Sequence, residues 1–361
     1  MRTGEGIELR WEAMLKGIHM QADWLRSGPD ELLARARELL HEAPPRIYLS
    51  GCGDSHFAGI GARLAFERWS GIPTQAVESL ELSRYELELA PAGSWVVCVS
   101  NSGRVVRTVE AAAEARSRSL TAIAVTYAPE SRLAETADVT LAFSYEDPGF
   151  GPGTISYIAS LGALYALAWR AKELAEGQSL RGCPWDTAGI AEATAETIEL
   201  SAVLAEQLAA SLPDDAKIDI LGGGPSLGTA LFGRAKLIES AHSPGGAHEL
   251  EEWAHEEFFC TRPGVTTIVV APPGASHDRA VEQLEAARKV GATTIAVSPS
   301  SVPADLVLPV AAGTPEELSP LTYCVPLELL AYHYASSRGL TMLGFDDESR
   351  RSLNYHQIFG E

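Results

Sequence analysis

The sequence predicts an α/β protein built from two doubly wound parallel sheets related by an internal repeat. Short apolar runs alternate with helical stretches, which is typical of a parallel sheet covered on both faces. The same pattern occurs twice along the chain. A length of 361 residues, at roughly 150 per domain, also suits two domains.

The repeat is visible at an offset of 171 residues, which places Ile47 on Ile218. The other identical pairs at this offset are Gly51 and Gly222, Gly53 and Gly224, Ser55 and Ser226, and Arg63 and Arg234. The same offset places 95–103 on 266–274, and 123–126 meets 295–298 one residue further out. Three matches in register indicate that both halves share one fold.

The elements of the first half follow from its apolar runs. Strands are expected at 46–50, 73–77, 94–100, 120–126 and 138–142. Helices are expected at 5–42 (amphipathic), 106–117, 153–175 (mostly buried) and 187–211. Pro44 and Pro45 mark the entry to the first strand.

These elements divide the chain into five expected parts. In chain order they are an N-terminal helical extension (1–43), a first domain with the ligand-binding loops (44–175), a helical connector (176–213), a second domain (214–345) and a C-terminal arm (346–361).

The charge and the cysteines exclude several classes of protein. A formal net charge of −20 argues against nucleic acid and anionic membrane surfaces as partners. No run of 18 apolar residues and no signal peptide is visible. The five cysteines form no CxxC pair, which favours a reducing cytoplasm and no structural zinc. The cysteines are Cys52, Cys98, Cys183, Cys260 and Cys324.

Two loops that follow strands in the first half carry a candidate anion site. Ligands of open α/β sheets bind beyond the carboxyl ends of the strands. Residues 51–56 (Gly-Cys-Gly-Asp-Ser-His) and 100–103 (Ser-Asn-Ser-Gly) offer glycine turns, hydroxyls and free N–H groups to a phosphate. In the second half the matching loop, 271–274, reads Ala-Pro-Pro-Gly and has lost the hydroxyls. Such loops also occur as plain turns, but their selective loss in the repeat favours function.

These two loops resemble the phosphosugar-binding loops of the sugar isomerase (SIS) domain family. The tandem arrangement over about residues 40–361 resembles the isomerase half of the glutamine–fructose-6-phosphate aminotransferases, and related glucosamine-6-phosphate deaminases and fructosamine-6-phosphate deglycases. The resemblance implies two SIS domains and a set of sugar-phosphate-binding residues. These are Cys52 and Gly53 through their backbone, with Ser55, Ser100, Asn101, Ser102, Thr108 and Thr154.

The same resemblance implies catalytic residues in the second half. Lys236-Leu-Ile-Glu239 resembles the helix whose glutamate moves a proton between C1 and C2 of the sugar. Glu252-Trp-Ala-His255 resembles the Glu-x-x-His motif whose histidine assists ring opening, often from a neighbouring subunit. A carboxylate and a histidine near neutral pKa suit these two steps. Glu-x-x-His also occurs in metal sites, but no third ligand cluster is visible, so neither a metal nor another cofactor is expected.

The C-terminal arm departs from the aminotransferase pattern. There an arm lysine forms a Schiff base with the sugar, but in this chain no lysine follows Lys289. The lysine's position falls near Asn354, and His356 or Arg350 could act in its place. The alternative is a packing or subunit contact. No glutaminase domain is visible in these 361 residues either.

Three functions are therefore open. The first is an aldose–ketose isomerase/deaminase acting on an (amino) hexose 6-phosphate such as glucosamine 6-phosphate or fructose 6-phosphate. The second is a fructosamine-6-phosphate deglycase, and the third is a non-catalytic sugar-phosphate-binding regulator. The expected partner is a small sugar phosphate, and the resemblance implies a cytoplasmic homodimer.

Overall fold

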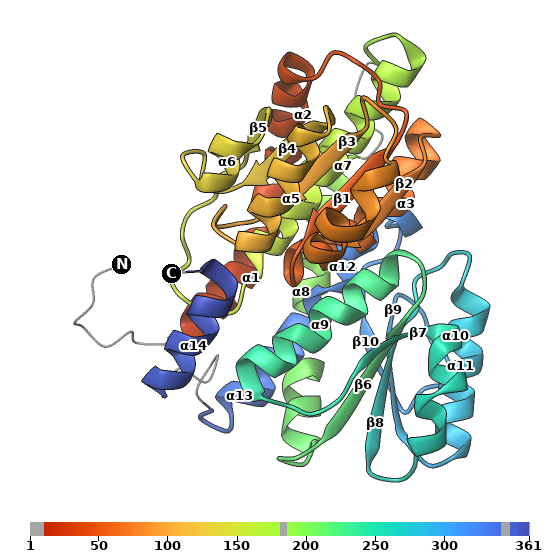
Figure 1. The fold of residues 1–361 in the computed structure, drawn as a ribbon. Coiled ribbons are helices and arrows are strands. Elements are labelled where there is room, and N and C mark those ends of the chain that lie inside the picture. Colours follow the sequence, from red (N-terminus) through yellow and green to blue (C-terminus); the bar gives the residue numbers. More distant parts are fainter. Residues whose placement is uncertain (1–10, 181–185, 341–346, 361) are drawn as a thin grey trace.

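The computed structural model describes residues 11–180, 186–340 and 347–360. They form two parallel sheets of five strands, one above the other in Figure 1. The strand orders are β2-β1-β3-β4-β5 and β7-β6-β8-β9-β10, so the sheets share one topology. The predicted fold class, two doubly wound parallel sheets related by an internal repeat, is confirmed.

The strands expected in the first half all form, and each begins one residue later than expected. The first sheet contains β1 (Ile47–Gly51), β2 (Thr74–Glu78), β3 (Trp95–Val99), β4 (Thr121–Thr126) and β5 (Val139–Ala142). The second contains β6 (Lys217–Gly222), β7 (Ala247–Glu249), β8 (Val265–Val270), β9 (Thr293–Ser298) and β10 (Leu306–Pro309).

Helices connect these strands. Those before the connector are α1 (Trp11–Leu25), α2 (Gly28–Leu39), α3 (Asp54–Ser70), α4 (Ser79–Glu81), the π-helical turn η1 (Leu82–Glu86), the 3-10 turn η2 (Leu87–Leu89), α5 (Val106–Ser117), α6 (Arg132–Thr136) and α7 (Ile155–Glu176). The others are α8 (Thr187–Ser211), α9 (Pro225–Ala241), α10 (Leu250–His255), the 3-10 turn η3 (Glu257–Cys260), α11 (His277–Lys289), the 3-10 turn η4 (Glu316–Leu318), α12 (Pro320–Tyr323), α13 (Val325–Ser336) and α14 (Glu348–Phe359).

The N-terminal extension differs from the single amphipathic stretch expected. It forms two helices, because Gly28 and Pro29 start a new helix after α1 ends at Leu25. The expected residues 5–10 lie outside the described part of the chain. Helix α1 packs against α8 of the connector and α13 of the second half, and α2 packs against α7. The extension is therefore part of the common core, and the expected domain limits stay predictions.

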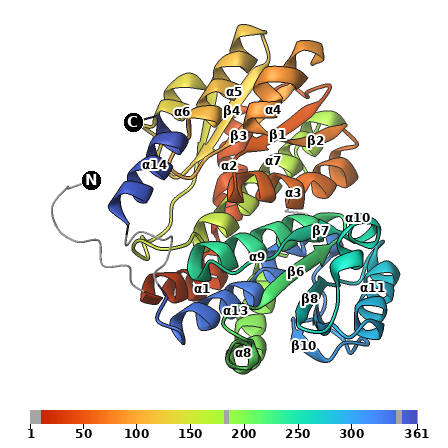
Figure 2. The same cartoon turned by 60° about the horizontal axis from the view of Figure 1, so that its bottom comes forward.

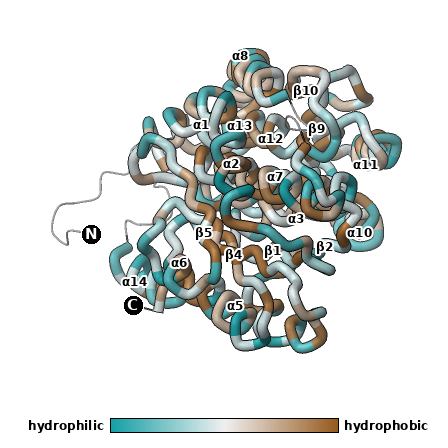
Figure 3. The backbone as a smooth tube through the Cα atoms, turned by 90° about the horizontal axis from the view of Figure 1, so that it is seen from above, coloured by the Kyte–Doolittle hydropathy of each residue, from teal (hydrophilic) through white to brown (hydrophobic). Residues whose placement is uncertain are grey.

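The largest apolar core lies between the two sheets. Along β1, Ile47 and Leu49 point into this core, while Tyr48 points to the smaller core beneath α5. Helices α3 and α7 of the first half meet α9 and α13 of the second within it (Figure 2). Figure 3 shows the first sheet as mainly hydrophobic tube and α14 as mainly hydrophilic tube. The two halves therefore share one interior. None of the described helices is long and apolar enough to cross a membrane.

The topology positions the candidate site. The chain passes from β1 to β2 on one side and returns to β3 on the other, so the strand order switches between β1 and β3. Ligands of doubly wound sheets bind at the carboxyl ends of such strands. The loops 51–56 and 100–104 follow these two strands directly.

Candidate active site

The loop after β1 turns sharply into helix α3. A Cβ at Gly51 would lie 2.6 Å from Cβ of Ser55, so only glycine permits this approach. Gly53 begins the helix with a φ of +55°, and Gly224 repeats this φ of +55° before α9. The 17-residue helix α3 directs its free N–H groups at the switch point, which suits an anion.

The side chain of Cys52 is hydrogen-bonded beneath this loop. Its Sγ donates a hydrogen bond to Oε1 of Glu78 at 3.0 Å and lies 3.8 Å from Oγ1 of Thr108. Burial and the nearby Glu78 raise the pKa of Cys52 to about 11, so the thiol stays protonated. The Thr108 hydroxyl is buried and lies 3.2 Å from Oγ of Ser79. Thr108 thus supports the loop from beneath, and Cys52 presents its backbone.

The loop after β3 presents a buried hydroxyl. Ser100 is 2% exposed, and its Oγ has no hydrogen-bond partner among the described residues. Such a group costs about 1–3 kcal/mol unless a ligand or water pairs with it. Oδ1 of Asn101 accepts a hydrogen bond from Tyr145 at 3.0 Å, and Oγ of Ser102 accepts one from the Arg104 N–H at 3.3 Å. Ser100 therefore supplies the strongest signal of a ligand in this loop.

Gly103 holds this loop against the next one, and its replacement gives a testable prediction. Its φ is +62°, and a Cβ would lie 1.9 Å from Oγ of Ser131. Gly177 has a similar φ of +67° with no atom within 4 Å of such a Cβ. We expect Gly177→Ala to cost about 1 kcal/mol of unfolding free energy, and Gly103→Ala about 1–3 kcal/mol more because of the collision. Urea denaturation of both variants measures the difference, and equal losses would contradict the steric explanation.

Ser102 also borders a surface pocket of about 610 Å³. This volume is within the usual range for small-molecule sites of about 300–1,000 Å³. Its lining comprises Ser102, Arg104, Tyr127, Ala128, Pro129, Glu130, Ser131 and Arg132. Most of the lining comes from the loop after β4, and Glu239 is not part of it.

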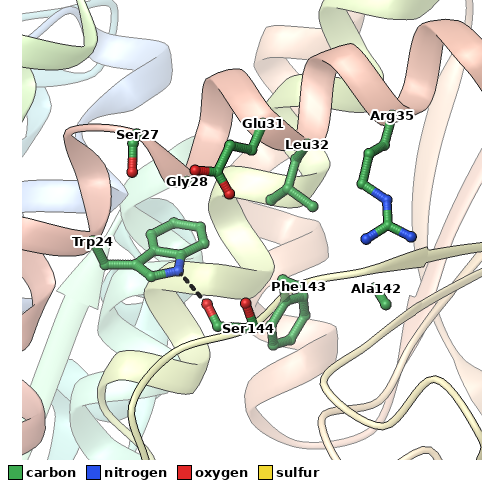
Figure 4. A pocket seen from close by; sticks show the side chains of 9 residues that line it. All are labelled: Trp24, Ser27, Gly28, Glu31, Leu32, Arg35, Ala142, Phe143 and Ser144. Carbon is green, nitrogen blue, oxygen red and sulfur yellow. Dashed lines mark hydrogen bonds between the residues drawn. The ribbon is translucent and has the colours of Figure 1, made fainter.

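The pocket drawn in Figure 4 is a different one. It measures about 130 Å³ and lies between the turn before α2 and the end of β5, where Trp24 donates a hydrogen bond from Nε1 to the Ser144 carbonyl at 2.8 Å. None of its lining residues comes from the two loops, and the volume is small for a hexose phosphate. We therefore do not assign it to the candidate site.

The C-terminal helix α14 lies beside the second loop. Tyr355 accepts a hydrogen bond from Nη2 of Arg104 at 2.8 Å, and the Arg104 guanidinium also lies over the rings of Tyr355 and Phe359. His356 is the exposed neighbour of Tyr355. The structure thus brings the arm to the loop through Arg104.

A buried lysine joins the two halves at the site. Nζ of Lys236, on α9, donates hydrogen bonds to Oδ2 of Asp54 at 2.7 Å and to Oε2 of Glu239 at 2.6 Å. Lys236 is fully buried, whereas Asp54 and Glu239 are 25% and 30% exposed. Because Asp54 is the first residue of α3, this cluster places Glu239 beside the first loop.

The cluster changes the protonation of its members. Burial and the charge of Asp54 together raise the pKa of Glu239 to about 7, although Lys236 lowers it. Burial alone would lower the pKa of Lys236, but the two carboxylates raise it above its usual range. Glu239 therefore exchanges a proton near neutral pH, whereas Lys236 stays charged. A general base works best with such a pKa.

Glu252 and His255 lie elsewhere. Both are exposed on α10, whose Leu250 and Trp253 pack on the outer face of the second sheet. Helix α9, with Glu239, covers the inner face, and Figures 1 and 2 show α10 away from α14. His255 is 71% exposed, with Nε2 lying 3.4 Å from Oε1 of Glu251. The structure does not bring these two residues to the loops within one chain.

Thr154 packs in different surroundings from the loop residues. It is 2% exposed and precedes α7, and its Oγ1 would lie 2.3 Å from a Cβ at Gly17 of α1. Its side chain is thus packed against the N-terminal helix. A sugar contact from this hydroxyl stays a prediction without support from its packing.

The counterpart loop in the second half is occupied by a carboxylate of the chain itself. Oε1 of Glu316 accepts a hydrogen bond from the Ala275 N–H at 2.8 Å, and Oε2 lies 2.6 Å from Arg68. A Cβ at Gly274 would lie 2.3 Å from that Oε1, so the Glu316 side chain lies directly against this loop. Ala275 matches Arg104 in the repeat. Glu316 thus takes the place where an anion would meet this loop.

Within residues 11–180, 186–340 and 347–360, no group of three or more His, Cys, Asp or Glu residues is arranged to hold a metal ion. The four described cysteines are free, and Cys183 lies outside the described residues.

The fold and these loops define a class of protein: paired doubly wound domains with two candidate anion-binding loops beside their junction. Residues 39–170 match the family model described as SIS domain. This match covers most of the first half of the chain, and the second sheet repeats the topology of the first. The resemblance found in the sequence is confirmed.

Curated relatives match most of the chain. The glutamine–fructose-6-phosphate aminotransferase (isomerizing) of Methanothermobacter thermautotrophicus is 30% identical over 338 residues, covering 91% of this chain and 55% of the relative. That of Pyrobaculum aerophilum is 28% identical, covering 94% of this chain and 56% of the relative. The chain thus spans about half the length of these relatives.

Solved structures share the whole fold. The C-terminal domain of glucosamine-fructose-6-phosphate aminotransferase from Francisella tularensis is 19% identical with a TM-score of 0.80, covering 94% of this chain and 99% of that domain. Glucosamine-6-phosphate deaminase from Thermotoga maritima is 19% identical with a TM-score of 0.71, covering 91% of this chain and 96% of that one. The two-sheet arrangement is therefore that of solved phosphosugar proteins.

Proposed function

We propose that this chain is a phosphosugar-processing enzyme, an isomerase/deaminase acting on an (amino) hexose 6-phosphate. The observation that carries the proposal is the cluster of Asp54, Lys236 and Glu239. It holds a carboxyl group with a pKa of about 7 beside a loop built for a phosphate. The names of the similar proteins, an aminotransferase and a deaminase of sugar phosphates, support this reaction class.

In the proposed reaction, Glu239 moves one proton. In the open-chain aldose its carboxylate removes the proton from C2, the electron pair forms a C1=C2 double bond, and O1 takes up a proton. Protonated Glu239 then returns a proton to C1, while the O2 proton leaves, giving the ketose. With an amine at C2, the same sequence gives a C2 imine, and water replaces the nitrogen to release ammonia. Lys236 keeps the carboxylate of Glu239 in place through its hydrogen bond.

The two loops would hold the phosphate, and their serines give a testable prediction. Hydrogen bonds to a charged group contribute about 1.5–3 kcal/mol. We therefore expect Ser100→Ala and Ser102→Ala each to weaken binding of fructose 6-phosphate roughly tenfold to a hundredfold. Isothermal titration calorimetry measures this effect. Binding of unphosphorylated fructose, and binding by the surface variant Ser300→Ala, should not change; equal losses for both sugars would refute a phosphate contact.

The remaining residues keep proposed roles. Ser55, Asn101 and the backbone of Cys52 and Gly53 would complete the phosphate contacts, whereas Thr108 would act by supporting Cys52. His255, with Glu252 on the same helix, would assist ring opening only from a second copy of the chain, because α10 lies apart from the loops. A homodimer is part of this proposal. His356 would approach the sugar through the arm that Arg104 fixes.

The reaction is tested by a panel of substrates. The protein is incubated with glucosamine 6-phosphate, with fructose 6-phosphate plus ammonia, and with a 6-phosphofructosamine, and the products are followed by NMR. We expect ammonia and fructose 6-phosphate from the first. Turnover of the fructosamine alone would indicate a deglycase. Binding without turnover of any of them would indicate a regulator and overturn the proposal.

A further inference from the structure

A buried glutamate lies behind the Lys236 cluster. Glu328 on α13 and Gln21 on α1 are both fully buried. Nε2 of Gln21 donates a hydrogen bond to Oε2 of Glu328 at 2.7 Å. Helix α13 packs against both α1 and α9, the helix that carries Lys236. The glutamate thus belongs to the interior that supports the candidate site.

One oxygen of each side chain lacks a hydrogen-bond donor among the described residues. Oε1 of Gln21 and Oε1 of Glu328 are both buried, and neither has a hydrogen-bond partner among the described residues. An amide oxygen and an ionised carboxylate oxygen both accept hydrogen bonds, so neither can donate to the other. A protonated carboxyl group carries one donor, which Gln21 Oε1 can accept. A proton on Glu328 would therefore supply the donor that these two oxygens lack.

The surrounding charges favour the same proton. The charged groups that act on Glu328 from the packed elements are Lys236 on α9 and Asp54 on α3. Glu328 in turn raises the pKa of Tyr157 on α7 and of Cys324 before α13. Helix α8 turns hydroxyls inward, from Thr194, Thr197 and Ser201. If Asp54, Glu239 and Glu328 were all ionised, one lysine would face three carboxylates. Buried charges without partners are costly, so one proton on this group is favoured.

We propose that Glu328, buried against Gln21, is a neutral carboxylic acid, and that it positions Lys236 by leaving Asp54 and Glu239 as the only ionised partners of that lysine. Burial and the charge of Asp54 together raise the pKa of Glu328 to about 8. The hydrogen bond from Gln21 and the charge of Lys236 act in the opposite direction. Ionised Glu328 would compete with Glu239 for Lys236. The positioning role rests on the proposed function, whereas the charge state of Glu328 does not.

Infrared spectroscopy of the sugar-free protein tests the charge state. At neutral pH the carbonyl absorption of protonated carboxylic acids should be weaker in Glu328→Gln than in the unmodified protein, in which Glu328 adds to the contribution of Glu239 with its pKa of about 7. The matched variant Glu239→Gln should retain the contribution of Glu328. Raising the pH through about 8 should remove it from the unmodified protein. Identical spectra for the unmodified protein and Glu328→Gln in this region would overturn the proposal.

Denaturation measured across pH gives a second test of the protonation of Glu328. Because the folded pKa of about 8 exceeds the ordinary 4.5, the native state binds more protons between these values and loses stability as pH rises. Relative to Glu328→Gln, the folding equilibrium constant should therefore fall about tenfold per pH unit across this window and level off above it.

Each outcome of this titration decides the question. A constant difference between the two proteins would overturn the proposal. Failure of Glu328→Gln to fold would do so too, because the amide reproduces the shape and neutrality of the acid and can donate to Gln21. Neither measurement uses a sugar, so failure of either would leave the isomerase/deaminase proposal untouched, and failure of the substrate panel would leave the charge state of Glu328 untouched.

Discussion

Glu239→Gln should lower the rate of proton exchange at C2 of a bound sugar phosphate by about 10²–10⁴-fold, the usual contribution of a general base. The amide oxygen can still accept the hydrogen bond from Lys236, so the fold and the cluster should persist. Binding should be largely retained, because the proposed phosphate contacts lie in the first half. The exchange is measured by NMR in deuterated buffer.

The pH profile sharpens this expectation. A base must be ionised, so the exchange rate of the unmodified protein should rise with pH through about 7, the raised pKa of Glu239. Glu239→Gln should lose this dependence. The matched control is Glu199→Gln, which changes an exposed glutamate on α8. An unaffected rate in Glu239→Gln would remove this residue from the mechanism.

The second large effect concerns stability. Lys236→Met removes the buried cation between Asp54 and Glu239 and leaves two neighbouring carboxylates without it. Breaking a buried ion pair from one side costs about 3–5 kcal/mol. We expect a loss of this size in the free energy of unfolding at neutral pH, measured by chemical denaturation. The loss should shrink as the pH falls below about 7, where Glu239 takes up a proton.

A surface lysine provides the comparison. Lys289 is 76% exposed and pairs only weakly with Glu285, at 3.6 Å. Lys289→Met should therefore change the stability by less than about 0.5 kcal/mol. A loss below about 1 kcal/mol for Lys236→Met would show that the cluster does not hold the two halves together at this point.

Much of the fold could be predicted because each strand–turn–helix unit is encoded in a short stretch of sequence. The glycine turn at Gly53 recurs at Gly224 with the same φ, so one pattern fixed two strand–helix units. The helices at 106–117 and 187–211 form with the expected bounds. The break after Leu25 was missed although Gly28 and Pro29 are a start signal, because the amphipathic period continues across it.

The candidate site was only partly predictable. Glu239 and the serines carry motif signals, but Asp54 and Lys236 meet across 182 positions of sequence, which no local pattern reveals. Glu328 had a signal, a lone carboxyl group within the apolar run 325–331. Its partner Gln21 lies 307 positions away. Long-range charge pairs depend on how helices pack, and spacing along the chain does not encode that.

The central claim is that one sugar phosphate spans the loops of the first half and Glu239 of the second. A crystal structure with bound fructose 6-phosphate tests it most directly. We predict the phosphate at Ser100, Ser102 and the start of α3, with C1 or C2 within about 3 Å of the Glu239 carboxylate. A phosphate bound at the counterpart loop beside Glu316, or a sugar directed away from Glu239, would contradict the account.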